Sequence, residues 1–215
     1  MKFSVNQKDL QQSLSYCQGV IEKRSTLPIL SNVLIDASNS KLKITATDLD
    51  LIFINEIKNV EIIEEGKTTT VSSTIYDIIR KFSSGKKINF ELTEENKIHL
   101  ESEKSIFNLN CLDATEFPLT DENFSGNVFT IKSNKLLKLL NKCKFSVSND
   151  ETRHYLSGIY FHQTNIEDKY FLTAVATDSH RMSISKVLLK EKIQFDPIIM
   201  PKKTIFQICS ILEDY

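Results

Sequence analysis

The stretch FSVNQKDLQQSLSYCQGVI, residues 3–21, recurs 126 positions later as FTIKSNKLLKLLNKCKFSV, residues 129–147. Apolar and cysteine positions coincide between the two stretches, including Leu14 with Leu140 and Cys17 with Cys143. Self-similarity at a fixed spacing indicates that one structural unit occurs more than once in a chain. The sequence therefore predicts two copies of one domain.

The similarity continues along the chain with one short interruption. The same spacing aligns LSNVLI at 30–35 with LSGIYF at 156–161. Beyond that point the spacing is 130, and it aligns ATD at 46–48 with ATD at 176–178. We interpret the change as four residues inserted around the polar segment HQTNIEDKY, residues 162–170. Matches on both sides of a single insertion favour duplication over chance.

The pattern of apolar residues predicts the elements of each copy. Each copy should begin with a short strand, KFSV at 2–5 or VFTI at 128–131, and continue with a helix. The first copy should then contain strands at 30–37, 41–48 and 49–62, a second helix at 75–82, and three further strands at 87–95, 97–104 and 105–112. Short connections between successive strands favour antiparallel pairing, so the fold class is α+β with an antiparallel sheet and two helices in each domain.

The spacing also sets the expected extent of each domain. The first copy should occupy residues 1–122 and the second residues 128–215. At a spacing of 130, Tyr215 is equivalent to Gly85, which precedes the last three strands of the first copy. We therefore expect the second domain to be incomplete at its C-terminal end.

Charge is distributed unevenly between the two copies. The net charge is −1, but residues 1–122 carry 14 Lys and Arg against 19 Asp and Glu, whereas residues 123–215 carry 13 against 9. Overall acidity argues against a protein that simply coats nucleic acid, because such binding depends on neutralising phosphates.

One helix is nevertheless expected to carry a basic face. Lys135, Lys138 and Lys142 lie opposite Leu140 and Cys143 at helical spacing, and no acidic residue occurs between Lys132 and Asp150. This face is either an ordinary solvated surface or a surface that meets a polyanion.

Other composition features exclude several classes of site. The four cysteines are far apart and lack a nearby histidine at metal-ligand spacing, so we expect buried apolar residues and no metal site. No apolar run is long enough to cross a bilayer or to act as a secretion signal, so we expect a cytoplasmic protein. No sequence motif implies a cofactor.

Five motifs resemble one protein family in their order and spacing. They are LPILSNVLI at 27–35, TATDLDL at 45–51, RHYLSGIYF at 153–161, TAVATDSHRMSI at 173–184 and IMPKKTI at 199–205. The chain is similar along its whole length to the bacterial DNA sliding clamp, the β subunit of DNA polymerase III. The resemblance implies a non-catalytic processivity factor of DNA replication, in which two three-domain subunits form a homodimeric ring with helices facing duplex DNA. On this interpretation the chain is an N-terminal fragment that lacks the third domain.

The resemblance also implies partners and their sites. Replicative polymerase, clamp loader and repair proteins would insert short linear peptides into a pocket formed by Leu156, Thr177, Ser179, His180, Arg181 and Met182. Ser179 departs from the glycine that is usual in the family. DNA would be contacted, without sequence preference, by Arg24, Lys135, Lys138, Lys142, Arg153, His154, Tyr155, Lys202 and Lys203. The ring would close through the strand SIFNLNCL, with Phe107 and Leu109 exposed on its edge.

Two other functions were weighed. Asp178, Ser179 and His180 supply the residue types of a hydrolase triad, but adjacent residues on a strand point to opposite faces, which disfavours an enzyme. A stand-alone, non-specific nucleic-acid-binding module should interleave aromatic and basic residues on a sheet face, whereas the 13 phenylalanines fall mostly at core-facing positions. A clamp should remain on circular DNA and slide off linear DNA, whereas a direct binder should not distinguish them.

Overall fold

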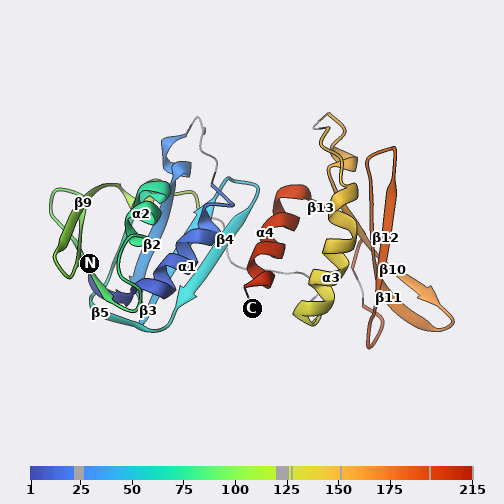
Figure 1. Ribbon diagram of the computed structural model, residues 1–215, viewed down its shortest axis with the longest axis horizontal. Helices are drawn as coiled ribbons and strands as arrows, with labels where there is room; N and C mark the ends of the chain where they lie inside the picture. The colour runs from blue at the N-terminus through green and yellow to red at the C-terminus, as the bar shows by residue number, and fades with distance from the viewer. Residues whose placement is uncertain (22–26, 120–125, 127, 151, 194, 215) are drawn as a thin grey trace. The chain divides into compact units, whose positions relative to one another are not determined.

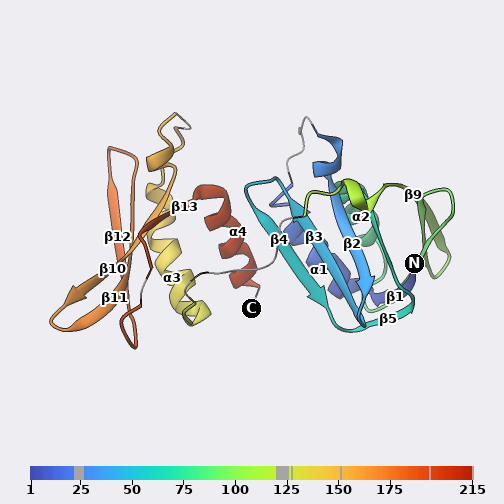
Figure 2. The same cartoon turned by 180° about the vertical axis from the view of Figure 1, so that it is seen from behind.

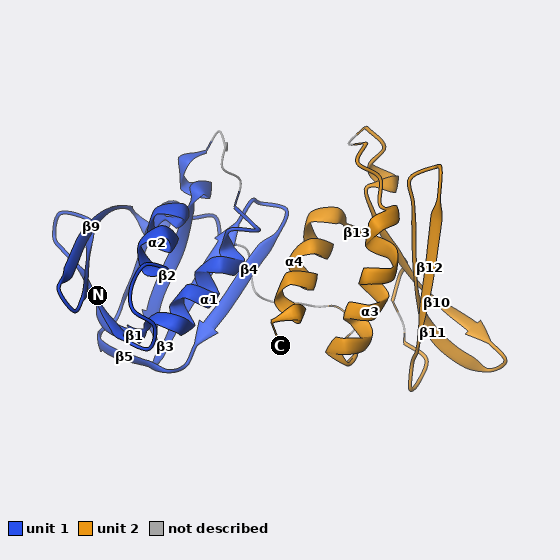
Figure 3. Ribbon diagram, in the orientation of Figure 1, with its two compact units in different colours: residues 1–120 blue, residues 121–215 orange. Residues whose placement is uncertain are grey.

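The structure, a computed structural model, describes residues 1–215 except 22–26, 120–125, 127, 151, 194 and 215. The chain divides into two compact units, unit 1 from Met1 to Thr120 and unit 2 from Asp121 to Tyr215 (Figure 3). Each unit combines antiparallel strands with two α-helices, as predicted for an α+β fold.

Unit 1 is an antiparallel sheet covered by two helices. Its elements are β1 (Lys2–Asn6), α1 (Gln7–Cys17), the 3₁₀ turn η1 (Pro28–Ser31), β2 (Asn32–Ser38), β3 (Lys41–Thr47), β4 (Ile52–Ile57), β5 (Val60–Glu64), β6 (Gly66–Val71), α2 (Ser72–Ile79), β7 (Lys87–Leu92), β8 (Lys97–Ser102), β9 (Ser105–Leu112) and η2 (Ala114–Glu116). The strand order is β4-β3-β2-β6-β9-β8-β7-β1-β5. Figures 1 and 2 show α1 and α2 side by side on the same face of this sheet.

Strand β9 joins the two halves of the sheet. Residues 105–110 pair with β8, whereas Cys111 and Leu112 pair with β6. The core lies between the sheet and the helices, where Phe3 of β1 stacks on Phe90 of β7 with ring centroids 4.6 Å apart. Burial of these aromatic and aliphatic side chains is the main term that stabilises the unit.

Unit 2 repeats part of this architecture. Its elements are α3 (Ser133–Cys143), η3 (Lys144–Ser146), η4 (His154–Leu156), β10 (Gly158–Ile166), β11 (Lys169–Thr177), β12 (Met182–Leu188), β13 (Ile198–Pro201) and α4 (Lys202–Glu213). The sheet order β12-β11-β10-β13 matches β4-β3-β2-β6 of unit 1. Helices α3 and α4 lie side by side, as α1 and α2 do (Figure 1).

The pairing registers confirm the predicted duplication. Asn32 of β2 faces Val71 of β6, and the equivalent Gly158 faces Pro201. Likewise Thr47 faces Ile52 across the β3–β4 turn, and Thr177 faces Met182 across the β11–β12 turn. The four strands of unit 2 thus repeat the order and register of four strands of unit 1, as a duplicated fold requires.

The predicted insertion lengthens one hairpin. Strands β10 and β11 each have 9 residues, whereas β2 and β3 each have 7. The two-residue turn is of one kind in both copies, because Asn39 and Ser40 have φ of 51° and 58°, and Glu167 and Asp168 have φ of 49° and 59°. The four extra residues therefore extend both strands by two and preserve the turn.

Three sequence expectations about strands are wrong. Residues 128–131 form no strand, because no described strand of unit 2 takes the places that β5 and β7 occupy beside β1. The single strand expected at 49–62 is broken at Lys58 and Asn59 into β4 and β5. Strand β6 was missed, since its buried residues are three consecutive threonines, 68–70, which give no apolar pattern.

Three of the four cysteines are buried, as predicted. Cys17, Cys143 and Cys209 are buried and Cys111 is half-buried, and all four are free thiols. Burial raises the pKa of the Cys17 thiol above its ordinary value. A high thiol pKa disfavours the reactive thiolate, so these residues serve the core.

Candidate functional surfaces

A hydrogen-bonded turn joins β11 to β12 and carries most of the predicted peptide pocket. The Asp178 Oδ1 accepts the backbone N–H groups of His180 and Arg181, both at 3.0 Å. Thr177 Oγ1 accepts the Ser179 N–H at 3.2 Å and donates to the Arg181 carbonyl at 2.8 Å. Thr177 and Asp178 therefore fix the turn at the strand end.

These hydrogen bonds also set the charge of the turn. The N–H groups of His180 and Arg181, followed by the Arg181 side chain, lower the pKa of the Asp178 carboxyl from its ordinary value. Asp178 is thus a carboxylate at neutral pH and only accepts hydrogen bonds. Its second oxygen accepts Arg181 Nε at 2.9 Å. Its oxygens bond to the turn and to Arg181, an arrangement unlike the orientation of a base in a hydrolase triad.

The same turn occurs in unit 1 with different residues on it. Asp48 Oδ1 accepts the N–H groups of Asp50 and Leu51 at 3.1 and 2.7 Å, and Thr47 Oγ1 accepts that of Leu49 at 3.0 Å. Leu49 and the equivalent Ser179 have φ of 81° and 77°. This left-handed conformation favours glycine, which gives a physical reason for the glycine expected at position 179.

The residues that follow the turn in unit 2 face solvent. His180 and Arg181 are exposed, and the Met182 side chain is 64% exposed. The Arg181 guanidinium lies over the ring of Phe145, 5.6 Å from its centroid. Phe145 is 57% exposed and was missed by the sequence analysis, although an aromatic residue in an otherwise lysine-rich stretch was a visible signal.

A loop after α3 approaches this turn. Arg153 Nη1 donates to Ser179 Oγ at 2.9 Å, which brings the loop beside the turn. Leu156, the last residue of η4 in this loop, is half-buried, whereas His154 and Tyr155 are exposed. Residues expected to contact peptide and residues expected to contact DNA therefore occur in one loop.

The basic face of α3 is present. Lys135, Lys138 and Lys142 are exposed, and within the described residues none of them forms an ion pair. With Lys186 of β12, which the sequence analysis missed, they line a groove of about 280 Å³. Four exposed ammonium groups around one groove, none of which forms an ion pair with another described residue, favour an anionic ligand.

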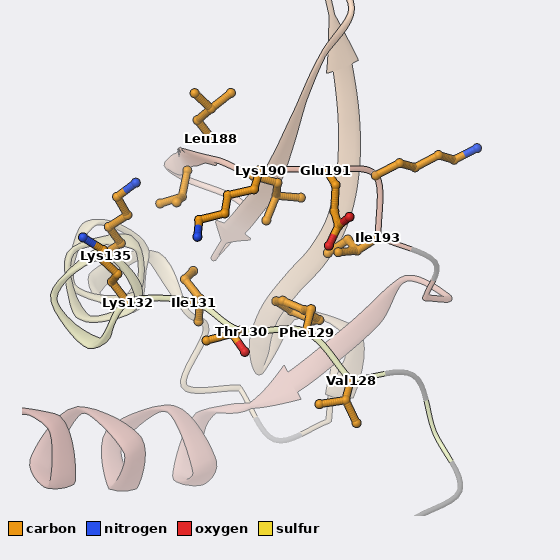
Figure 4. Close-up of a pocket in the computed structure, with 13 residues that line it drawn as sticks. Val128, Phe129, Thr130, Ile131, Lys132, Lys135, Leu188, Lys190, Glu191 and Ile193 are labelled. Carbon is orange, nitrogen blue, oxygen red and sulfur yellow. The ribbon is translucent and has the colours of Figure 1, made fainter.

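A larger cavity lies elsewhere in unit 2. It has a volume of about 640 Å³, and residues 128–132 and 187–193 form much of its lining (Figure 4). Lys132 and Lys135 reach it from the α3 side, and Lys190 reaches it from the segment after β12. The predicted peptide pocket is therefore not this cavity but an exposed surface around the β11–β12 turn.

Two further predicted DNA contacts lie at the start of a helix of unit 2. Lys202 and Lys203 begin α4, and the Lys202 ammonium donates to the side-chain oxygen of Asn149. Cations in the first turn oppose the helix dipole, so they reduce helix stability when no anion is near. Arg24 lies outside the described residues.

Strand β9, which was predicted to close the ring, is only partly as expected. Phe107 is 39% exposed and contacts Phe82 edge-on, with ring centroids 5.8 Å apart. Leu109 is 9% exposed and belongs to the core of unit 1, so the expectation that it is exposed is wrong. Along residues 105–110, no described strand pairs with the edge of β9 opposite β8.

Two family models match the chain in succession. The N-terminal domain of the DNA polymerase III beta subunit matches residues 1–121, and its central domain matches residues 130–215. The chain belongs to the DNA polymerase III beta subunit family. The two units described above are thus consecutive domains of a beta subunit.

Known beta subunits agree in sequence and in fold. The beta sliding clamp of Caulobacter vibrioides is 33% identical over 99% of this chain and 58% of its own length, and that of Rickettsia felis is 34% identical over 100% and 55%. The solved DnaN sliding clamp of Bartonella birtlesii, bound to griselimycin, is 34% identical with a TM-score of 0.92, over 100% of this chain and 57% of that one. The chain therefore spans little more than half the length of these beta subunits.

Other site classes receive no support from the described residues. In those parts of the chain, no three His, Cys, Asp or Glu side chains gather closely enough to hold a metal ion. Nor does any described helix have the length and apolarity needed to span a bilayer. For this beta subunit the β11–β12 turn and the basic face of α3 remain the candidate sites.

Proposed function

We propose that the chain functions as a DNA sliding clamp in the cytoplasm, which encircles duplex DNA and holds polymerase and other partners through short peptides, without catalysing a reaction. The contrast between the two copies of one turn carries this proposal. The turn in unit 1 presents Asp50 and half-buried Leu51, whereas the same turn in unit 2 presents exposed His180, Arg181 and Met182. This difference in surface on an equal backbone supports the proposal that unit 2 is adapted for recognition.

The peptide site is supported by the chemistry of this surface. Phe145 and Met182 are 57% and 64% exposed, and the Arg181 guanidinium lies over the Phe145 ring, which gives an exposed apolar surface beside Arg181. The adjacent Arg181 has donors left after its bond to Asp178. An apolar side chain flanked by a peptide carbonyl or carboxylate would fit both features. We propose that griselimycin, which the Bartonella birtlesii clamp binds, occupies this same surface.

Calorimetric titration with griselimycin tests the peptide site. Arg181→Ala and Met182→Ala should each weaken binding by about 1–2 kcal/mol, as truncation of interface anchors does. Ile63→Ala is the control, because Ile63 is 67% exposed on β5 of unit 1. Equal affinity of wild type, both variants and the control would contradict this site.

The DNA-facing surface is supported by the unpaired lysines of α3. Their ammonium groups would neutralise backbone phosphates, which carry no sequence information. A protein that slides along DNA requires this kind of contact. We propose that the groove between α3 and β12 lies near the duplex and that Lys186 adds to the contacts.

Charge reversal tests this surface. Changing Lys135, Lys138 and Lys142 to Glu should weaken binding of a short duplex most at low salt, where attraction is least screened. A matched triple reversal uses three exposed lysines away from α3: Lys58 and Lys104 between strands, and Lys169 at the start of β11. Equal losses in both triple variants would show that only net charge matters. Retention on circular but not linear DNA by the assembled ring would distinguish a clamp from a stand-alone binding module.

Ring closure is proposed at β9. The edge of residues 105–110 opposite β8 can accept another strand, and exposed Phe107 can pack against it. The partner would be another beta subunit, which gives the homodimeric ring. Phe107→Asp should therefore lower the dimer fraction in sedimentation velocity, whereas Ile63→Asp, which changes an exposed residue of unit 1 outside β9, should not. A dimer fraction unaffected by Phe107→Asp would contradict closure at β9.

A further inference from the structure

One side chain connects the candidate peptide surface of unit 2 to a loop that carries predicted DNA contacts. The Arg153 guanidinium donates from Nη1 to Ser179 Oγ at 2.9 Å and from Nε to Asp150 Oδ2 at 2.7 Å. Arg153 belongs to the loop after α3, and Ser179 to the β11–β12 turn. A single planar group therefore holds a loop and a turn in a fixed relation.

The loop end of this connection is well anchored. Asp150 Oδ1 accepts the Thr152 N–H at 3.0 Å and the Thr152 hydroxyl at 2.6 Å. The Leu156 carbonyl accepts the Ser148 N–H at 3.0 Å, which closes the base of the loop. Movement of Arg153 therefore moves the loop, including the adjacent His154 and Tyr155.

The turn end depends on a hydroxyl at one position. Ser179 has φ of 77° and directs its Oγ to Arg153. The equivalent residue of unit 1 is Leu49, with the same backbone conformation and no acceptor in its side chain. The connection is thus specific to the unit that carries the peptide surface, and glycine at position 179 could not make it.

We propose that Arg153 is a positioning residue that couples the peptide surface to the DNA-facing loop through Ser179. This inference rests on the proposed function. Because this hydrogen bond ties the loop to the turn, a ligand that favours one arrangement of the turn also favours one arrangement of the loop, and the second ligand then binds a population that is already shifted. Coupling of this kind is reciprocal, so DNA tightens peptide binding by the same factor by which peptide tightens DNA binding.

The test compares the affinity for a short DNA duplex with and without saturating griselimycin, measured by fluorescence anisotropy at low salt. Griselimycin should tighten duplex binding by about fivefold in the wild type, at the lower end of couplings between sites. The quantity compared is the coupling ratio, the duplex Kd without griselimycin divided by the duplex Kd with it. In Ser179→Ala this ratio should fall to about one, because the acceptor for Arg153 is gone. Ser179→Gly removes the same hydroxyl in a residue that adopts positive φ freely, so it should give the same ratio.

A rescue variant and a control separate coupling from a structural role. Ser179→Asn supplies an amide oxygen and tolerates positive φ, so it should restore the ratio. Leu49→Ala changes the equivalent position of unit 1 and should leave the ratio unchanged. A purely structural role would change the individual affinities but not their ratio.

The outcomes for the two proposals are distinct. Equal ratios in the wild type, Ser179→Ala and Ser179→Gly would overturn the coupling while leaving both binding sites intact. Failure of the wild type to bind griselimycin or DNA at all would refute the proposed function, and the coupling with it.

Discussion

The cores of the two units should respond independently to equivalent cavities. Leu14 of α1 and Leu140 of α3 occupy matching positions, and both are 0% exposed. They belong to separate clusters of buried residues. Leu→Ala deletes three carbons, worth about 2.4 kcal/mol of transfer free energy, and the residual cavity should bring the loss of unfolding free energy to about 3 kcal/mol.

Native-state hydrogen exchange can assign this loss to one unit. Leu14→Ala should accelerate the slowest amides of unit 1 by about two orders of magnitude and leave those of unit 2 unchanged, and Leu140→Ala should do the reverse. Ile63→Ala should change neither by more than about 0.5 kcal/mol, because this side chain is exposed. Equal acceleration in both units after either core substitution would refute the inference of two independent cores.

Three further changes have defined outcomes. Asn6 caps α1 by accepting the Lys8 N–H at 2.9 Å, so Asn6→Ala should cost unit 1 about 1 kcal/mol in a denaturant titration. Lys132 caps α3 with similar φ and ψ but no side-chain hydrogen bond, so Lys132→Asn should stabilise unit 2 by about 0.5–1 kcal/mol in the same assay. The pKa of Asp178 is lower in the folded protein than its ordinary value. The Asp178 carboxylate therefore stabilises the fold fully above the pKa of the unfolded chain, and this stabilisation is lost as the pH falls through the pKa of the folded protein. In Asp178→Asn the unfolding temperature should therefore fall less steeply as the pH is lowered than in the wild type. An equally steep fall in both proteins would contradict a stabilising role of the Asp178 carboxylate.

The sequence predicted what depends on residue pattern within one segment. The repeat located α1 and α3, because Leu14 with Leu140 and Cys17 with Cys143 define one buried helix face. The shift in spacing located the longer hairpin. The pairing registers then matched because equivalent residues face equivalent neighbours.

Features that depend on a partner strand were harder to predict. Residues 128–131 alternate like a strand, but a strand forms only where neighbours satisfy its backbone hydrogen bonds. Leu109 sits on a predicted edge, yet the side chains on one face of β9 point into the core. Neither outcome is encoded in the segment itself.

For the candidate site, the sequence supplied the turn but not its surroundings. The Asp178 turn follows from local chemistry, since short side chains bond to backbone N–H groups nearby. The approach of Phe145 to Arg181 and of Arg153 to Ser179 depends on how the loop after α3 folds back. Lys186 was missed because it lies on β12, and only the folded structure brings it beside the lysines of α3.

The two hairpins β2–β3 and β10–β11 have a consequence for length variation. A two-residue turn with positive φ at both positions closes only on a hydrogen-bonded pair of residues, and such pairs alternate along an antiparallel ladder. Ser38 with Lys41 and Ile166 with Lys169 are the closing pairs. Because hydrogen-bonded pairs occur at every second position, each strand can gain or lose two residues and still end on such a pair. One added residue on each strand, two in all, would end on a non-hydrogen-bonded pair and would require another turn. Beta subunits that retain this turn should differ at this hairpin in steps of four residues.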